Sequence, residues 1–194
     1  LFFYYWNTFL KHLTPILCNN KFDNFITLSE NSHEHVTIPY IDRKFRLSGY
    51  FQSYKYFERE FDHICKIIHL EEQKNAVRKN ISYDISECVS IHIRIGDYKT
   101  VQDSHPLLPM VYYERALFNI VSKTGKDVWK VLYFYEERDI NEVTPAIQSL
   151  KNKFPNIDFV SVDHSLEDYE QMLLMSMCSH NVIANSTFSW WGAY

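Results

Sequence analysis

His92, Arg94, Gly96 and Asp97 stand close together in the stretch HIRIGD, and their types and spacing suit the binding of an anion. Side chains two residues apart in a strand point to the same face, so His92 and Arg94 would share one site. A guanidinium group can form two parallel hydrogen bonds to phosphate oxygens, and a glycine lets a ligand approach the backbone closely. The stretch predicts a diphosphate site, but a structural ion pair between Arg94 and Asp97 beside a turn glycine explains the same residues.

A second group of polar residues lies in NSTFSWWG, residues 185–192, between a predicted strand and a predicted helix. Free backbone N–H groups and the helix dipole favour an anion at such a junction, and the hydroxyl groups of Ser186, Thr187 and Ser189 would add donors. The competing interpretation is an ordinary N-cap, with both tryptophans packed in the core. We expect Trp190 and Trp191 to be packed in the core.

A third group lies in YEERDINEV, where Asp139 and Glu142 have the spacing of a capping box for the following helix. A carboxylate at this place could also accept hydrogen bonds from the edge of a purine base. Glu136, Glu137 and Arg138 could form a solvated run of charges. The segment therefore predicts a helix start, with base recognition as the functional alternative.

Several motifs of metal and hydrolase chemistry are missing from the sequence. It has no Asp-x-Asp, no HExxH and no other close set of histidine and carboxylate ligands, so we expect no metal. It also has no GxSxG elbow and no GxxxxGK[ST] loop, which argues against a serine hydrolase of that type and a P-loop enzyme. The cysteines lack the CxxC spacing of zinc and redox sites, and we interpret them as core thiols. They are Cys18, Cys65, Cys88 and Cys178.

The composition is that of a globular chain without a surface for nucleic acid. The 194 residues are 46% hydrophobic with a formal net charge of -4, which allows a sizeable core and gives no basic excess. The opening LFFYYWNTFL is interrupted by polar residues well short of the ~20 apolar residues that span a bilayer, so we expect a buried helix or strand there. Because the chain opens without Met and stops at a predicted helix start, we expect a fragment.

The elements that must position these groups alternate between short apolar runs and helices. We expect strands at 88–95, 128–135, 157–162 and 181–184, and helices at 109–122, 140–152, 166–178 and from 187 onward. Strands separated by helices of this length favour a doubly wound α/β layer with a parallel sheet. Ligands of such sheets bind at the carboxyl ends of the strands, where the three polar segments would meet.

The first part of the chain carries weaker signals. Residues 1 to about 50 show little periodicity, and we expect irregular structure there. From Ser53 to about Lys79, apolar residues recur at the spacing of one helix face and predict a single long amphipathic helix.

Three stretches in this order, VSIHIRIGDY, HPLLPMVYYERAL and DYEQMLLMSMCSHNVIANSTFSWWGAY, closely resemble the α-1,2-fucosyltransferases of glycosyltransferase family 11. The stretch GYFQSYKYF fits the same family, so the resemblance runs from about Gly49 to Tyr194. It implies a GT-B-like glycosyltransferase with a Rossmann-like parallel sheet and flanking helices. Residues 1–80 would be a partial N-terminal, acceptor-side and helical connecting region, and residues 81–194 a GDP-sugar-binding domain truncated at its C-terminus.

The resemblance also implies a reaction. An inverting, metal-independent enzyme without cofactors would move L-fucose from GDP-β-L-fucose to the 2-hydroxyl of a β-galactoside. Its partners would be GDP-fucose and a galactose-terminated glycan, without nucleic acid. A peripheral or missing-anchor membrane association would be expected, in the Golgi for a eukaryotic source, and a cytoplasmic location for a bacterial or viral one. The alternatives are a truncated, non-catalytic remnant that binds GDP or glycans, and a nucleotide-binding protein of other chemistry.

By the same resemblance, Arg94 would bind the β-phosphate and act in catalysis, and His92 would lie on the nucleoside side. Gly96 and Asp97 would shape the loop. The general base is not identified, and Asp97 is its candidate. Asp139 falls where relatives place an acidic residue against guanine. The remaining residues expected at the donor are Asn185, Ser186, Thr187 and Ser189.

Overall fold

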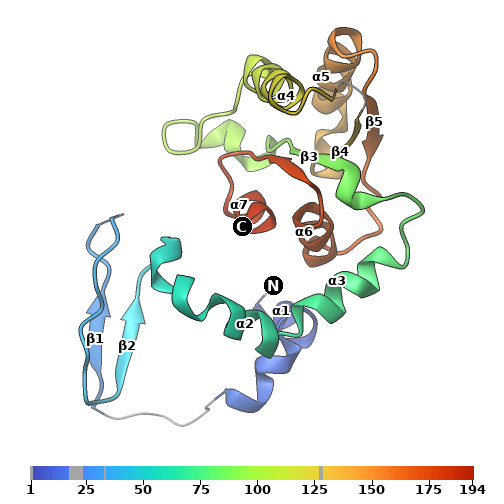
Figure 1. Cartoon of the computed structure of the whole chain (residues 1–194). Coiled ribbons are helices and arrows are strands. Elements are labelled where there is room, and N and C mark those ends of the chain that lie inside the picture. Colours follow the sequence, from blue (N-terminus) through green and yellow to red (C-terminus); the bar gives the residue numbers. More distant parts are fainter. Residues whose placement is uncertain (1, 18–23, 33, 127–128) are drawn as a thin grey trace. The chain divides into compact units, whose positions relative to one another are not determined.

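The computed structural model describes residues 2–17, 24–32, 34–126 and 129–194 of the chain. Contacts between Cα atoms divide the chain into two compact units, Leu1–Glu72 and Gln73–Tyr194 (Figure 1). The roles that the sequence predicts for residues 1–80 and 81–194 stay predictions.

In its described residues, the C-terminal unit has one four-stranded parallel sheet. The strands are β3 (Cys88–His92), β4 (Lys130–Phe134), β5 (Asp158–Ser161) and β6 (His180–Val182), in the order β5-β4-β3-β6. Each neighbouring pair is parallel. The predicted α/β class with a parallel sheet is therefore confirmed.

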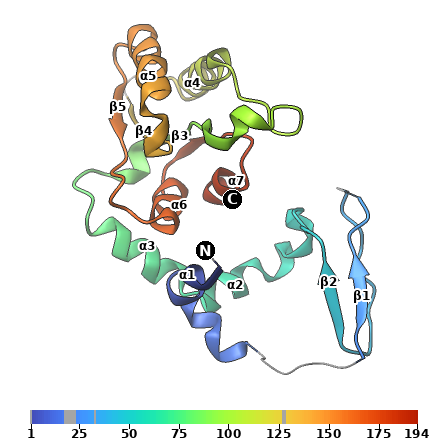
Figure 2. The same ribbon diagram turned by 180° about the vertical axis from the view of Figure 1, so that it is seen from behind.

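Helices flank this sheet on both faces. α4 (Met110–Thr124) and α5 (Ile140–Lys153) lie on one face, and α6 (Asp168–Ser176) and α7 (Thr187–Ala193) lie on the other, as two opposite views show (Figures 1 and 2). Two helical layers around a parallel sheet make a Rossmann-like unit, in agreement with the GT-B-like architecture that the resemblance implies.

The apolar core of this unit lies between the sheet and helices α4 and α5. Its least exposed members include Val89, Ile91, Tyr113, Leu117 and Ile147. Because alternate side chains of a strand point to opposite faces, His92 of β3 points away from this core, toward α6 and α7. The centroid of its ring lies 5.4 Å from that of Phe188 in α7.

The predicted boundaries of these elements hold to within a few residues, with physical reasons for the differences. β3 ends at His92 rather than Ile95, because the chain turns into a 3-10 helix at Gly96–Thr100 (η5). α6 starts at Asp168 because Glu167 caps it in a capping box with Glu170. The predicted strand at 128–135 begins in residues outside the described ones, and its described part contains β4.

The N-terminal unit contains more regular structure than the sequence predicts for residues 1 to about 50. Its elements there are α1 (Phe2–Asn7), the 3-10 helix η1 (Lys11–Ile16) and two paired parallel strands, β1 (Ile26–Ser29) and β2 (Phe45–Ser48). The prediction of irregular structure is wrong at these positions. Both strands are largely exposed and only four residues long, so the alternation of apolar and polar residues in ITLS and FRLS is too short to be a strong signal.

The predicted single helix from Ser53 to about Lys79 is wrong, because the segment is broken into short pieces. These are the 3-10 helices η2 (Tyr54–Tyr56) and η3 (Glu58–Glu60), and the α-helices α2 (Phe61–Ile67) and α3 (Leu70–Arg78). His69 separates α2 from α3 with a φ of 56°, in the left-handed region that ends helices. Its ring stacks on that of His12 with centroids 3.9 Å apart, a tertiary contact that helical periodicity does not reveal.

The aromatic segment at the start of the chain forms helix α1, and a helix is one of the two elements expected there, the other being a strand. Tyr4, Tyr5 and Trp6 of α1 are half-buried rather than buried. Among the described residues, no helix is long and apolar enough to cross a membrane.

The prediction of core thiols is confirmed for two of the cysteines. Cys88 and Cys178 are buried, whereas Cys65 is half-buried. Burial raises the pKa of the Cys178 thiol to about 12, so this group is an unreactive part of the core. Cys18 lies outside the described residues.

Candidate functional site

The order of the strands places a candidate site at the carboxyl end of β3. From β3 the chain moves outward through β4 to β5, and then returns to the other side of β3 to form β6. Ligands of open parallel sheets bind where the strand order reverses in this way, outside the carboxyl ends of the strands. Here the reversal lies between β3 and β6, and the loop that carries Arg94 and Gly96 starts there.

A hollow of about 510 Å³ opens at this edge of the sheet. Its lining comes from the ends of β3 and β4, from the segment that leads into α6, and from α7. The polar and aromatic residues that the argument uses are His92, Arg94, Glu136, Glu137, His164 and Phe188. His92 and Arg94 thus line one hollow, as the sequence predicts, although Arg94 lies two residues beyond the end of β3.

Arg94 is held by carboxylates from two loops. Its Nη2 atom lies 2.6 Å from Oδ1 of Asp97, and its Nη1 atom pairs with Oε1 of Glu136. Its guanidinium carbon lies 5.2 Å from the centroid of the Tyr98 ring. The Nε atom is buried and has no hydrogen-bond partner among the described residues. The structural ion pair with Asp97 is thus formed, while the Nε donor of the same guanidinium group has no partner among the described residues.

Glu136 contacts a second arginine as well. Its Oε1 atom faces Arg94, and its Oε2 atom pairs with Nη2 of Arg138. The Glu136 side chain is 30% exposed and lines the hollow, while that of Arg138 is 62% exposed. Glu136 thus pairs with Arg94 across the loops after β3 and β4, and with Arg138 within its own loop. The predicted solvated run of charges is wrong for Glu136, whereas Arg138 is largely exposed.

Gly96 and Asp139 join these two loops. Gly96 has a φ of 30°, and its backbone N–H donates to Oδ2 of Asp139 across 2.7 Å. Asp139 is only 2% exposed. It stands at the N-cap position of α5 but makes no side-chain cap hydrogen bond, so the predicted capping box with Glu142 is wrong. The reason is that the carboxylate points across to Gly96 instead of along its own helix.

Lys99 adds a cation to the same pair of loops. Its Nζ atom pairs with Oε1 of Glu142 and lies 3.9 Å from Oδ1 of Asp139. Both oxygens of Asp139 therefore face groups of the loop after β3. The predicted contact of Asp139 with a guanine base stays a prediction, and such a base would compete with these partners.

His92 is buried and electrically neutral near pH 7. Burial, and next the charge of Arg94, lowers the pKa of its imidazole to about 4. Its Nδ1 atom is buried without a hydrogen-bond partner among the described residues. A buried nitrogen without a partner is costly, and a ligand in the hollow could satisfy it.

His164 is a lining residue that reasoning from the sequence missed. Its Nε2 atom is also buried without a partner in the described part of the chain, and its ring stands perpendicular to that of Tyr135, with centroids 4.7 Å apart. A signal was present, because His164 follows β5 and the carboxyl-end rule applies to that strand as well. Phe188 was missed in the same way, although it lies within NSTFSWWG.

Polar groups of the hydroxyl-rich segment before α7 form hydrogen bonds to other groups of the protein. Asn185 donates through Nδ2 to the backbone oxygen of Pro106 at 2.9 Å, and its own backbone oxygen accepts a hydrogen bond from Tyr98 at 3.1 Å. Ser189 is buried and its hydroxyl lies 3.2 Å from the backbone oxygen of Ser186. The segment is therefore tied to the η5 loop through Tyr98.

The N-cap and the core packing of both tryptophans, predicted as one interpretation of this segment, are only partly formed. Ser186 occupies the N-cap position of α7, but its side chain makes no cap hydrogen bond. Thr187 is exposed. Core packing is wrong for Trp191, which is 41% exposed, whereas Trp190 is half-buried. A phosphate role for Asn185, Ser186, Thr187 and Ser189 stays a prediction.

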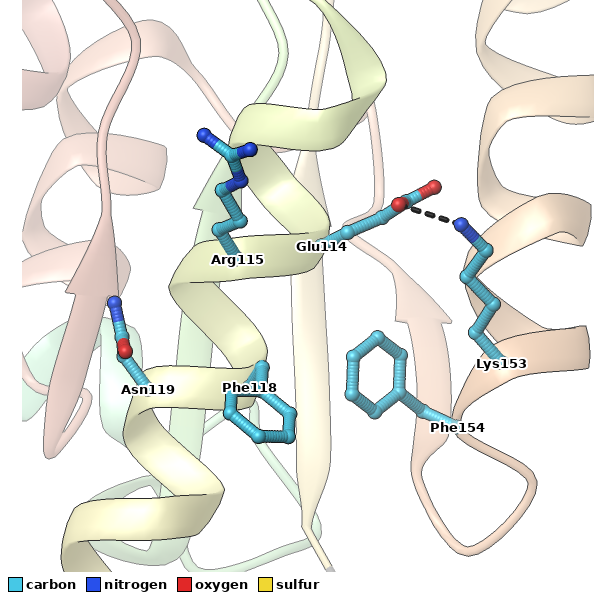
Figure 3. Close-up of a pocket in the computed structure, with 6 residues that line it drawn as sticks. All are labelled: Glu114, Arg115, Phe118, Asn119, Lys153 and Phe154. Atoms are coloured by element: carbon cyan, nitrogen blue, oxygen red, sulfur yellow. Dashed lines mark ion pairs between the residues drawn. The ribbon is translucent and has the colours of Figure 1, made fainter.

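A second hollow, of about 460 Å³, lies on the outer side of α4 and α5 (Figure 3). Its lining residues are Glu114, Arg115, Phe118, Asn119, Lys153 and Phe154. Lys153 and Glu114 form an ion pair of 2.5 Å across it, and Phe118 is 64% exposed. The hollow takes no residue from the loops at the carboxyl edge, so we do not assign it to the candidate site.

Metal ligation finds no support in the geometry of the described residues. Among them, no group of three histidine, cysteine, aspartate or glutamate side chains is arranged to hold a metal ion. The metal independence of the reaction stays a prediction.

Comparisons with known proteins agree with the fold. The family described as "Glycosyl transferase family 11" matches residues 17–194. The chain is 33% identical over 159 residues to the "O-antigen biosynthesis glycosyltransferase WbnK" of Escherichia coli, covering 76% of this chain and 49% of that protein. It is 27% identical over 152 residues to an "Alpha-1,2-colitosyltransferase" of Escherichia coli, covering 75% of this chain and 49% of that protein.

The chain spans about half the length of the curated relatives that it matches. No solved structure matches it significantly.

Proposed function

The chain belongs to glycosyl transferase family 11, and we propose that it is the donor-binding part of an inverting, metal-independent fucosyltransferase. The enzyme would move L-fucose from GDP-β-L-fucose to the 2-hydroxyl of a β-galactoside. The observation that carries this proposal is the hollow at the carboxyl end of β3, where Arg94 and His92 present buried nitrogens without partners. Such nitrogens favour a ligand rich in oxygen atoms, as a diphosphate is.

Arg94 has the central role in this proposal. When the glycosidic bond to GDP breaks, negative charge builds up on the diphosphate while the sugar becomes cationic. A guanidinium group fixed at the end of a strand stabilises that charge without having to reorganise during the reaction. The pairs with Asp97 and Glu136 and the contact with Tyr98 fix the group in this position.

His92 and Gly96 would serve binding rather than proton transfer. The neutral imidazole of His92 can donate or accept one hydrogen bond at the buried end of the hollow, on the nucleoside side. Gly96 allows the turn that brings the η5 loop to the hollow. Asp97 pairs with Arg94, so its carboxylate would have to leave this pair to act as the general base.

The nature of the transferred sugar needs its own test. The name of one relative specifies colitose and an α-1,2 linkage. The linkage agrees with the proposed transfer to a 2-hydroxyl, whereas the sugar differs from fucose. Colitosyl transfer is therefore a second candidate function for the same site.

The proposed function is tested with the purified protein, a β-galactoside such as lactose, and GDP conjugates of fucose and of colitose. We expect a fucosylated product linked through the 2-hydroxyl, formed equally well in the presence of EDTA. Efficient transfer from the colitose donor alone would favour the second candidate. GDP binding without any product would favour a non-catalytic remnant, and the absence of both would contradict the proposal.

A further inference from the structure

Two guanidinium groups converge on one carboxylate at the edge of the hollow. Glu136 offers one oxygen to Arg94 and the other to Arg138. A carboxylate held in this way imitates two oxygens of a phosphoryl group, because guanidinium groups bind both anions with the same geometry. The arrangement therefore has the form of an anion site that is filled by a side chain of the protein.

The backbone is shaped to admit the second guanidinium group. A Cβ atom at position 96 would lie 2.9 Å from Nη2 of Arg138 and 3.2 Å from each carboxylate oxygen of Glu136. A side chain at this position would displace the ends of both groups from their present places. The close approach shows that the end of the Arg138 side chain lies against the η5 loop although most of that side chain is exposed.

The charges show why Glu136 has to leave for a diphosphate to bind. Glu136 pairs with both Arg94 and Arg138. With Asp97, which also pairs with Arg94, these four groups carry no net charge and attract a diphosphate only weakly. If the Glu136 side chain leaves, the diphosphate meets two cations, Arg94 and Arg138, with one carboxylate beside them. The exposure of Glu136 at the hollow allows its side chain to turn away while its backbone oxygen still accepts the hydrogen bond from Asp139 at 2.8 Å.

We propose that Arg138 is a second phosphate-binding residue, and that Glu136 is an internal anion that the diphosphate of the donor displaces from between Arg94 and Arg138. The inference rests on the proposed function for the identity of the donor, but not for the anion site itself. Its alternative is a purely structural Glu136 that holds the two arginines in place. The two possibilities predict opposite changes in diphosphate affinity when the Glu136 carboxylate is removed. Loss of a competing anion tightens binding, whereas loss of a structural support weakens it.

The test is calorimetric titration of the purified protein with GDP, inorganic diphosphate and guanosine. For Arg138→Gln we expect the dissociation constants of GDP and diphosphate to rise about tenfold, the loss of one partly exposed charge-assisted contact. For Glu136→Gln we expect them to fall by at least about threefold. Guanosine binding should not change in either variant, since guanosine has no phosphate.

Matched controls separate these effects from a general change of charge. Glu137→Gln removes the same charge from the next residue in the lining of the hollow, and should tighten binding less than Glu136→Gln. Arg115→Gln removes a positive charge at the second hollow and should leave GDP binding unchanged. Arg138→Lys, which keeps the charge, replaces Arg138→Gln if the latter does not fold, and should still weaken binding because it loses the planar fork.

The outcomes distinguish this inference from the proposed function. GDP binding that is unaffected by Arg138→Gln, or weakened by Glu136→Gln, overturns the inference and leaves the proposed function standing. Diphosphate binding that depends on Arg138, with no preference for GDP over diphosphate, supports the anion site and counts against the proposed donor. Failure of the folded protein to bind either ligand overturns both.

Discussion

The backbone N–H of Gly96 donates a hydrogen bond of 2.7 Å to the carboxylate of Asp139, which lies 43 residues further along the chain. The bond joins the loop after β3 to the loop after β4, and these loops carry Arg94 and Glu136. The placement of Arg94 and Glu136 at the hollow therefore depends on a residue that lines no part of it.

Replacement of Asp139 by alanine removes this link. We expect the free energy of unfolding to fall by about 1.5–3 kcal/mol, because a hydrogen bond to a charged and buried acceptor is lost. Chemical denaturation measures this change. Glu142→Ala, which removes only an exposed partner of Lys99, is the control and should have little effect.

The same position tests base recognition. If Asp139 only positions the loops, Asp139→Asn retains an acceptor for Gly96 and should keep the preference for GDP over ADP. Competition binding with the two nucleotides measures this preference. A selective loss of GDP affinity in Asp139→Asn would show instead that the carboxylate contacts guanine.

Replacement of Gly96 by alanine should impair binding more than stability. The positive φ costs about 1–2 kcal/mol for a residue with a side chain, and the added methyl group would collide with Arg138 and Glu136. We expect GDP affinity to fall at least about tenfold as the guanidinium group is pushed out. Gly125→Ala is the matched control, because its φ of 66° brings the same strain with no atom within 4 Å of the new methyl group. Similar losses of GDP affinity in both variants would refute the steric argument.

Replacement of Arg94 by lysine tests the charge at the end of β3. Lysine keeps the charge but not the planar fork, so the diphosphate is poorly paired when charge develops on it. We expect a loss of roughly 2–4 kcal/mol, or about 30- to 1000-fold in kcat/KM for GDP-fucose. An Arg94→Lys enzyme that retains most of its kcat/KM would exclude the proposed role. Arg115→Lys serves as the control at a distant surface.

The buried imidazole of His92 should make stability depend on pH. Its pKa is about 4 in the folded protein against an ordinary value of 6.5, so between these values the unfolded chain binds more protons. Stability should therefore decrease as the pH falls from 6.5 to about 4, by about 3 kcal/mol for this group. The dependence should shrink in His92→Gln, measured by denaturation at pH 4.5 and 7, and should persist in a variant of the exposed His105.

Replacement of His164 by phenylalanine should move binding and stability in opposite directions. Phenylalanine keeps the packing against Tyr135 but removes the buried Nε2 atom that has no partner in the described residues. The free energy of unfolding should stay the same or rise. The affinity for GDP should fall roughly 3- to 10-fold if the donor satisfies that nitrogen. Unchanged GDP affinity would show that His164 does not contact the donor.

Much of the C-terminal unit could be predicted because its helices bury one face each and its central strand β3 is a short, fully buried run. Apolar periodicity indicated the strands and helices, and their alternation indicated a parallel sheet, as the four parallel strands confirm. The two-residue period of a strand was sufficient to place His92 and Arg94 at one hollow. These features depend on residues near one another in the chain, and local patterns carry that information.

The partners of the charged residues could not be predicted in the same way. Asp139 and Glu142 have the local spacing of a capping box, yet Asp139 binds Gly96 and Glu136 joins Arg94 to Arg138. No apolar pattern marks the break at His69, and the alternation in the exposed strands β1 and β2 extends over only four residues each. Each of these features arises where segments distant in the chain meet, and a carboxylate pairs with whichever donor the packing of the strands and loops brings within reach.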